Sequence, residues 1–175
     1  MRTRGLKKRW INVAVAFVLF LTAQDSKGLQ MPKEGQWGDK AGGLAVSISV
    51  PEGSFKASDD AMLNIILKDF GTMPVSLVVR SSWVDYTYLV RNSHGQEMTM
   101  NEHGRQRAEA ALEGRKILRD LQPGESRSED FEVSKAFDLE PDTYIVVVTR
   151  TFPRPERRGE FFTAQSNEVT FQISK

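Results

Sequence analysis

From Leu44 to the end of the chain, apolar and polar residues alternate with the two-residue period of β-strands. The first stretch runs from Leu44 to Val50, where every second residue is aliphatic and the residues between are Ala or Ser. Because successive side chains of a strand point to opposite faces, this period predicts a strand with one buried face. Similar patterns predict strands at residues 62–70, 75–79, 86–90, 116–118, 131–133, 145–148, 161–162 and 169–173. The continuous aliphatic run 145–148 predicts a central strand.

Turn-forming residues separate these strands and favour hairpin connections. Gly71 and Pro74 end the second strand, and residues 92–95 read Asn-Ser-His-Gly. Pro123-Gly124 places a proline and a glycine at the two central positions of a type II turn, the second of which needs a positive φ. Residues 105–112 are rich in Arg, Gln, Glu and Ala and show no alternation, so they predict one short helix or an ordered loop.

Seven to nine short strands without alternating helices predict an all-β fold. The arrangement that fits is a two-sheet antiparallel immunoglobulin-like sandwich over residues 44–175, with the short helix near 105–112. Tyr144 follows Pro141 closely, so its hydroxyl is placed to bond back to the preceding backbone, as in a tyrosine corner. The alternative is a buried tyrosine that simply opens a strand.

Residues 1–23 have the order of a secretory signal peptide. Arg and Lys crowd positions 2–9, an uncharged run from Trp10 to Leu21 follows, and Thr22-Ala23 supplies small residues for cleavage. The run from Trp10 to Ala23 has fourteen residues, whereas a membrane-spanning helix needs roughly 17 to 25, so cleavage is favoured over retention as an anchor. We therefore expect an exported protein of bacterial type, periplasmic or extracellular.

Residues 24–43 predict a flexible linker or tail between this signal and the sandwich. Glycines and mixed charges predominate there, and few apolar residues are present to form a core. Trp37 is the largest apolar residue of the segment. It could dock on its own domain or on a partner.

Charge and cysteine content exclude several classes of function. The whole chain has a formal net charge of +1, and loss of the cations in residues 1–23 would leave residues 24–175 at −4. A weakly acidic domain does not suit nonspecific nucleic-acid binding, which requires many cations against phosphates. The absence of cysteine excludes disulfides, thiolate catalysis and cysteine metal ligands.

Four motifs follow one another in the carboxyl-terminal half. They are Leu121–Ser126, Phe137–Leu139, Pro141–Val146 and Ser166–Phe171, which read LQPGES, FDL, PDTYIV and SNEVTF. With them, residues 44–173 resemble the immunoglobulin-like domains of secreted bacterial proteins, and the small intracellular proteinase inhibitor of bacilli looks similar in outline. The resemblance implies a sandwich fold and no particular activity, because the motifs encode turns and core positions.

The candidate catalytic and metal-binding residues form no recognised motif. His94 and His103 have Glu97 and Glu102 nearby, but their spacing fits no familiar zinc pattern, and neither His-Glu-x-x-His nor Gly-x-Ser-x-Gly occurs. The acidic run Asp138-x-Glu140-x-Asp142 could hold calcium or could lie in water as a solvated loop. We expect no enzyme activity, no cofactor and no bound metal.

The segment 152–159 is the clearest candidate for recognition. Two prolines stiffen it, and Arg154, Arg157 and Arg158 offer planar donors for carboxylates, phosphates or acidic glycans. The alternative is solvated charge in an exposed hairpin.

Together these features predict an exported, non-catalytic domain that binds or supports another envelope or extracellular component. The partner would be a protein or an acidic glycan rather than a nucleic acid, and no stable membrane insertion is expected after signal cleavage. A secreted proteinase-inhibitor-like protein that presents the stiff loop is the alternative.

Overall fold

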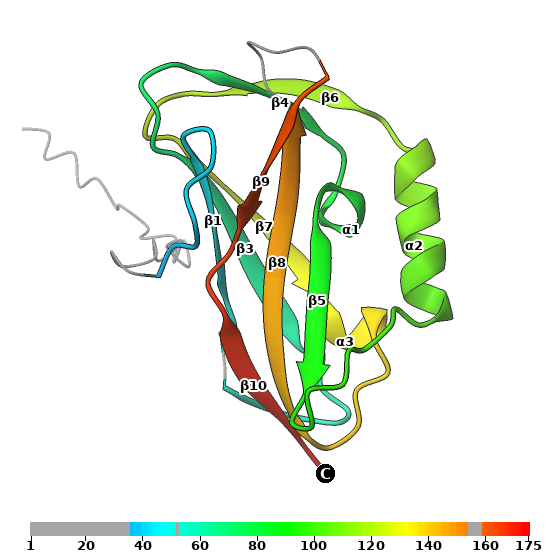
Figure 1. The fold of residues 1–175 in the computed structure, drawn as a ribbon. Helices are drawn as coiled ribbons and strands as arrows, with labels where there is room; N and C mark the ends of the chain where they lie inside the picture. The colour runs from blue at the N-terminus through cyan, green and yellow to red at the C-terminus, as the bar shows by residue number, and fades with distance from the viewer. Residues whose placement is uncertain (1–35, 52, 154–158) are drawn as a thin grey trace, which may run out of the picture.

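The fold is all-β, as the sequence predicts. It is that of a computed structural model, which describes residues 36–51, 53–153 and 159–175 (Figure 1). The strands are β1 (Leu44–Ser49), β2 (Ser54–Lys56), β3 (Met62–Asp69), β4 (Val75–Val79), β5 (Thr87–Asn92), β6 (Ile117–Leu121), β7 (Ser126–Glu132), β8 (Thr143–Pro153), β9 (Phe161–Gln165) and β10 (Val169–Ser174). The helices are α1 (Ser82–Asp85), α2 (Glu102–Glu113) and α3 (Val133–Ala136). The predicted signal peptide 1–23, and the predicted tail before Gln36, lie outside the described residues.

Two sheets pack on a shared apolar core, and a two-stranded ribbon extends one of them. The first sheet has the order β1-β3-β7, and the second has the order β2-β10-β8-β5, with β9 also paired to β8. All pairs are antiparallel except β2 with β10, which are parallel. β8 has partners on both edges, which confirms the predicted central strand. The pattern of the sequence missed β2, because three residues are too few to show a period.

The ribbon of β4 and β6 continues the pairing of β3 and β7 beyond an interruption. β3 pairs with β7 as far as Lys68, and β4 resumes an antiparallel pairing with β6 at Val75. Between β6 and β7, Gly124 has a φ of +81°, and the Glu125 N–H donates to the Gln122 carbonyl at 2.8 Å. These two features confirm the predicted turn. The ribbon brings the end of β4 to the upper end of β8 in Figure 1.

The long strand β8 supplies much of the core. Every second residue from Tyr144 to Phe152 is buried, and one of these inward positions holds Arg150. The Tyr144 hydroxyl donates to the Glu140 carbonyl at 2.9 Å. This bond confirms the predicted backward hydrogen bond, and it ties the turn before β8 to the first buried residue of the strand.

β1 is buried on both faces, so the prediction of one buried face was wrong. Ser47, which alternates with the aliphatic positions, is only 2% exposed. The segment before β1 covers its outer face: the Gly38 N–H donates to the Val46 carbonyl at 3.0 Å, and Ser47 Oγ donates to the Gln36 carbonyl at 2.7 Å. Trp37 docks within the domain, with its ring 5.2 Å from that of Phe70 in an edge-to-face contact.

α2 confirms the predicted helix and is longer than expected. The Asn101 side chain caps it by accepting from the Gly104 N–H at 2.8 Å. At Gly104, a Cβ would lie 2.7 Å from the Ala136 carbonyl oxygen, so the helix start packs directly on α3. Most other side chains of α2 are exposed, and in Figure 1 the helix stands beside the sandwich rather than on it. In the described part of the chain, no helix is long and apolar enough to cross a bilayer.

Candidate functional site

A groove of about 310 Å³ lies where the end of β4, the short helix α1 and the end of β8 meet. Its walls are Leu77, Val78 and Arg80 on one side, residues 150–153 on the other, and α1 residues Val84 and Asp85 between them, with Phe161 of β9 also at the wall. We call it the Arg80 groove. It brings together charged, apolar and backbone groups from segments far apart in the sequence.

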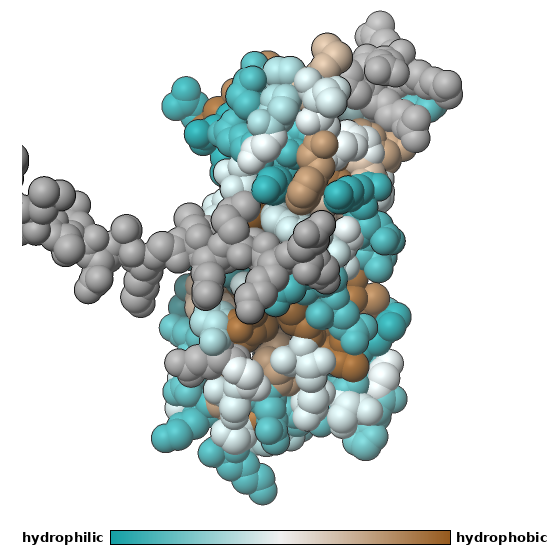
Figure 2. All heavy atoms as spheres, turned by 90° about the vertical axis from the view of Figure 1, so that its left-hand side faces the viewer, coloured by the Kyte–Doolittle hydropathy of each residue, from teal (hydrophilic) through white to brown (hydrophobic). Residues whose placement is uncertain are grey.

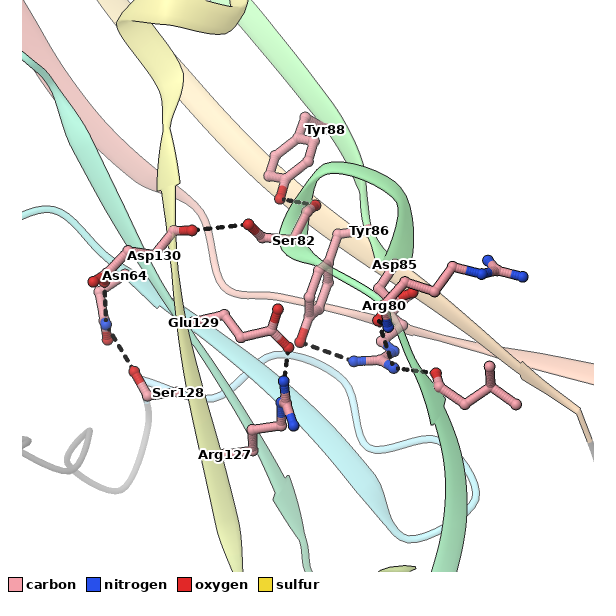
Figure 3. Close-up of polar contacts among 12 residues, drawn as sticks. Asn64, Arg80, Ser82, Asp85, Tyr86, Tyr88, Arg127, Ser128, Glu129 and Asp130 are labelled. Atoms are coloured by element: carbon pink, nitrogen blue, oxygen red, sulfur yellow. Dashed lines mark hydrogen bonds and ion pairs between the residues drawn. The ribbon is translucent and has the colours of Figure 1, made fainter. Parts of the chain in front are cut away.

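Arg150 reaches the groove from the core-facing side of β8. Its side chain is 4% exposed, and it donates from Nη1 to the Tyr86 hydroxyl at 3.2 Å and from Nη2 to the Val78 carbonyl at 3.1 Å (Figure 3). The Arg150 Nη2 also lies 3.4 Å from Asp85 Oδ2. The guanidinium carbon also lies over two aromatic rings, 5.0 Å from the centroid of Tyr86 and 5.3 Å from that of Phe152.

Asp85 is the counter-charge that makes this burial tolerable. Its side chain is 4% exposed, and Oδ2 accepts from the backbone N–H of Arg80 at 2.8 Å as well as from Arg150. A buried guanidinium requires such a partner, because an isolated charge in the interior is costly. The carboxylate therefore has two roles: it neutralises Arg150, and it holds α1 against the end of β4.

Two tyrosines beside this ion pair remain neutral phenols. Burial raises the pKa of Tyr86 to about 12, although the neighbouring Arg150 cation acts in the opposite direction. Burial also raises the pKa of Tyr88, whose hydroxyl donates to the Ser82 carbonyl at 2.7 Å. Ser82 Oγ in turn donates to the Asp130 carbonyl at 2.8 Å, so the network joins α1 to β7 (Figure 3). These hydrogen bonds hold α1, which carries the groove residues Val84 and Asp85, against β7.

Arg80 differs from Arg150 in having no acidic partner among the described residues. Its Nε is buried and makes no hydrogen bond within the described part of the chain. Figure 3 shows the Arg80 side chain extending away from Tyr86, and Asp85 accepts a hydrogen bond from the Arg80 backbone N–H. Asp85 neutralises the charge of Arg150, so the positive charge of Arg80 remains as the net charge of the described walls.

Exposed apolar side chains surround the Arg80 groove. Val78 is 47% exposed and Phe161 is 64% exposed, although both are large apolar residues at strand positions. Leu118 pairs with Val78 across the β4–β6 ribbon and is also exposed. Scattered apolar residues are normal on a protein surface, but a group of them beside an uncompensated cation is typical of an interaction site.

A second hollow of about 430 Å³ lies between β1 and β10. Ile48, Val50 and Val169 supply apolar side chains to it, and Gln36 stands at its edge. Figure 2 shows the side of the molecule on which β1 lies, with apolar residues gathered across the middle of the face. Gln36 leads directly into residues 1–35, which the structure does not describe. Of these two hollows, the Arg80 groove is the one lined by a buried ion pair, that of Arg150 with Asp85.

The predicted recognition residues Arg154, Arg157 and Arg158 lie outside the described residues. Pro153, which precedes them in the chain, lines the Arg80 groove. Neither Arg80 nor Arg150 is among the residues that the sequence pattern predicts as functional. The signal for Arg150 was available, because it continues the buried alternation of β8 at a position where an aliphatic residue would be expected.

The two histidines lie in different surroundings. His94 occupies the turn after β5, where its N–H donates to Asn92 Oδ1 at 3.1 Å, and His103 lies on α2 with its ring 6.4 Å from that of Trp83. Within the described residues, no three His, Asp or Glu side chains come together as a metal site. Among the described residues, His94 and His103 are therefore not gathered with Glu97 and Glu102 into one site.

The acidic run before β8 is used in local hydrogen bonds. Asp138 Oδ1 accepts from Asn101 Nδ2 at 2.9 Å, which links this run to the cap of α2. Asp142 Oδ1 accepts from the Thr143 N–H at 2.7 Å. Hydrogen bonds from Ser93 and Thr143 hold the pKa of Asp142 below its usual value. These contacts explain the acidic residues as parts of the loop structure.

Comparison with known proteins finds likeness among solved structures. No family model matches the chain, and no curated protein matches it. The crystal structure of the C-terminal domain of Wzt is similar, with a TM-score of 0.46 and 16% sequence identity over 79% of this chain and 77% of that one. The all-β assignment therefore rests on the strands and sheets described above.

Proposed function

We propose that this chain is an exported, non-catalytic domain of immunoglobulin-like type that binds a protein component of the envelope or the extracellular space through the Arg80 groove. The observation that carries the proposal is the Arg80 cation, which has no acidic partner among the described residues and lies beside the exposed Val78 and Phe161 side chains. Cations and exposed apolar residues at one place favour association with a complementary surface. The signal-like order of residues 1–23 supports export.

The chemistry of the described groove supports binding rather than catalysis. Asp85 is the carboxylate of its described walls, and both Arg150 and the Arg80 N–H occupy the same oxygen. Asp85 is engaged in a buried ion pair with Arg150, whereas a general base has to reach a substrate proton. Tyr86 has a pKa of about 12, which makes it a poor acid or base at neutral pH. A rigid arrangement of this kind suits recognition.

The experiment is a pulldown from the native envelope and secreted fractions with residues 24–175 as bait. The matched baits are the double variant Val78→Ser/Phe161→Ser, the triple variant Arg154→Ser/Arg157→Ser/Arg158→Ser, and Arg105→Gln on the exposed α2 as a control. We expect one protein to be captured by the unchanged bait and by the control, and to be lost with the double variant. Equal capture by all four baits, or no specific capture, would contradict the proposal.

The triple variant tests whether the predicted loop takes part in binding together with the Arg80 groove. Loss of capture with this variant would add the arginines of the predicted loop to the binding surface, and capture that survives would restrict the surface to the Arg80 groove. If the captured protein is a protease that the domain inhibits, the inhibitor alternative replaces simple adhesion. Inhibition is measured directly with that protease and a fluorogenic peptide.

A further inference from the structure

We propose that the Arg80 groove takes an extended, acidic peptide segment of its protein partner, which adds as a short strand to the free edge of β8 and places a carboxylate on Arg80. This inference rests on the proposed function and specifies its partner. Three features carry it: the edge of β8, the charge of Arg80 and the apolar border of the groove.

Among the residues that the structure describes, the upper end of β8 pairs with a strand on one edge only. β5 pairs with β8 no further than Thr149, opposite Thr87, whereas β9 follows the other edge from Thr149 to Pro153. Residues 150–153 therefore have an edge without a strand partner in the described part of the chain, and these four residues line the Arg80 groove. A free edge beside a groove is the geometry that strand addition requires.

The hydrogen-bonding groups of Thr151 point to that free edge. The Ser166 N–H donates to the Val148 carbonyl at 2.8 Å, so the backbone groups of Val148 face the β9–β10 side. Successive residues of a strand present their backbone groups to opposite edges. Thr149 and Thr151 must therefore face the other side, where Thr149 meets β5 and Thr151 meets the groove.

The length of the edge limits the partner to a short segment. Four residues of strand span roughly 13 Å, which is enough for a few residues of an added strand. Pro153 has no N–H, so at the end of this edge it contributes only a carbonyl. Thr151 is thus the residue that can both donate to and accept from the partner backbone, and side-chain contacts must supply the remaining specificity.

The charge of the groove selects an acidic segment. Asp85 compensates Arg150 through a contact of 3.4 Å, whereas Arg80 has no such partner among the described residues. A guanidinium recognises a carboxylate through paired, charge-assisted hydrogen bonds. An Asp or Glu of the added strand would supply the missing charge. Its aliphatic neighbours would cover Val78 and Phe161, because side chains of a strand alternate between its faces.

The test compares two substitutions at Thr151. Thr151→Pro removes the N–H that an added strand needs, and Thr151→Val keeps the N–H while removing the hydroxyl that lies 3.0 Å from Thr163 Oγ1. The probe is a phage-displayed library of random heptapeptides. It is selected on the protein that is expressed from the full-length chain and purified after any processing by the host cell. The strongest peptides are then synthesised with a fluorophore, and their affinity is measured by anisotropy for the unchanged protein and for each variant.

We expect the selected peptides to be enriched in Asp or Glu next to aliphatic residues. Thr151→Pro should weaken their binding by about tenfold or more, and Thr151→Val should leave it within about twofold, since only the former removes a backbone hydrogen bond. Arg80→Gln should weaken binding of the acidic peptides but not of their amide analogues. Bound peptide should also slow hydrogen exchange of the Thr151 amide in the unchanged protein, a readout that does not depend on how well the variants fold.

Several results would overturn the inference. Two concern the selection: it yields no peptide, or the selected peptides lack acidic residues. Two concern Thr151: the Pro and Val variants lose peptide affinity equally, or bound peptide leaves hydrogen exchange of the Thr151 amide unchanged. Acidic glycan fragments that compete for the groove and ignore Thr151→Pro would assign it to a carbohydrate instead. A natural partner whose capture is insensitive to Thr151→Pro would remove the strand pairing and leave the proposed function intact. Peptide binding without any natural partner would leave the strand pairing intact and remove the proposed function.

Discussion

Replacement of Arg150 by Met should destabilise the domain more than any exposed substitution. The guanidinium donates to Tyr86 at 3.2 Å and to Val78 at 3.1 Å, and it neutralises Asp85 at 3.4 Å with both charged side chains 4% exposed. Met fills a similar volume, so the main loss is the charge left on Asp85. Breaking a buried pair on one side costs about 3 to 5 kcal/mol, and a domain of ordinary stability has about 5 to 15 kcal/mol in total.

The assay is urea unfolding followed by tryptophan fluorescence, with the free energy of unfolding taken from the linear extrapolation. The decisive comparison adds Asp85→Asn, because the amide oxygen can still accept from the Arg80 N–H while the charge is gone. We expect the double variant to be about 2 kcal/mol more stable than Arg150→Met alone. Arg105→Gln, which breaks an exposed ion pair with Glu102, serves as the control and should leave the unfolding midpoint unchanged.

Either of two results would contradict the coupling of Asp85 with Arg150. One is an Arg150→Met variant whose stability lies within about 1 kcal/mol of the unchanged protein, which is the range of an exposed pair. The other is a double variant whose loss is the sum of the single losses, because the two charges would then act independently. Either result would mean that Asp85 and Arg150 do not form a coupled buried pair.

Three further predictions concern the fold around the site. Gly104→Ala should destabilise the protein by about 1 to 3 kcal/mol in urea, because the new Cβ would lie 2.7 Å from the Ala136 carbonyl. Tyr144→Phe should cost about 1 kcal/mol in the same assay, since it removes the 2.9 Å hydrogen bond to the Glu140 carbonyl. The folded pKa of Tyr86 is about 12, against an ordinary value of 10.0, so its contribution to stability should be complete below pH 10 and should be lost as the pH rises towards 12.

Each of these predictions has its own control. Glu109→Ala, on the exposed part of α2, should leave the free energy of unfolding nearly unchanged. If Gly104→Ala changed it just as little, α2 would not pack closely on α3. A Tyr144→Phe variant as stable as the unchanged protein would show that the backward hydrogen bond adds nothing. For Tyr86, the pH dependence should weaken in Tyr86→Phe, and an unchanged profile would assign the alkaline loss of stability to other groups.

Local patterns in the sequence determined the strands and several turns of this protein. The aliphatic run 145–148 became the centre of β8, Gly124 took its positive φ, and Tyr144 made its backward hydrogen bond, because each depends on residues only a few positions away. The helix near 105–112 was found for the same reason, although its cap at Asn101 was not. The period of apolar side chains and the residue types of turns are local properties, so they can be predicted directly from the sequence.

Contacts between distant segments were decided only by the tertiary structure. Ser47 is buried because the segment before β1 folds over it, and nothing in the alternation of β1 reveals that cover. Arg150 and Asp85 meet although 65 residues separate them. The edge of β8 near Thr151 has no strand partner in the described chain, because β5 ends opposite Thr149. Strand periodicity specifies which side chains share a face, but strand order and register depend on packing across the whole chain. The Arg80 groove is a product of that packing.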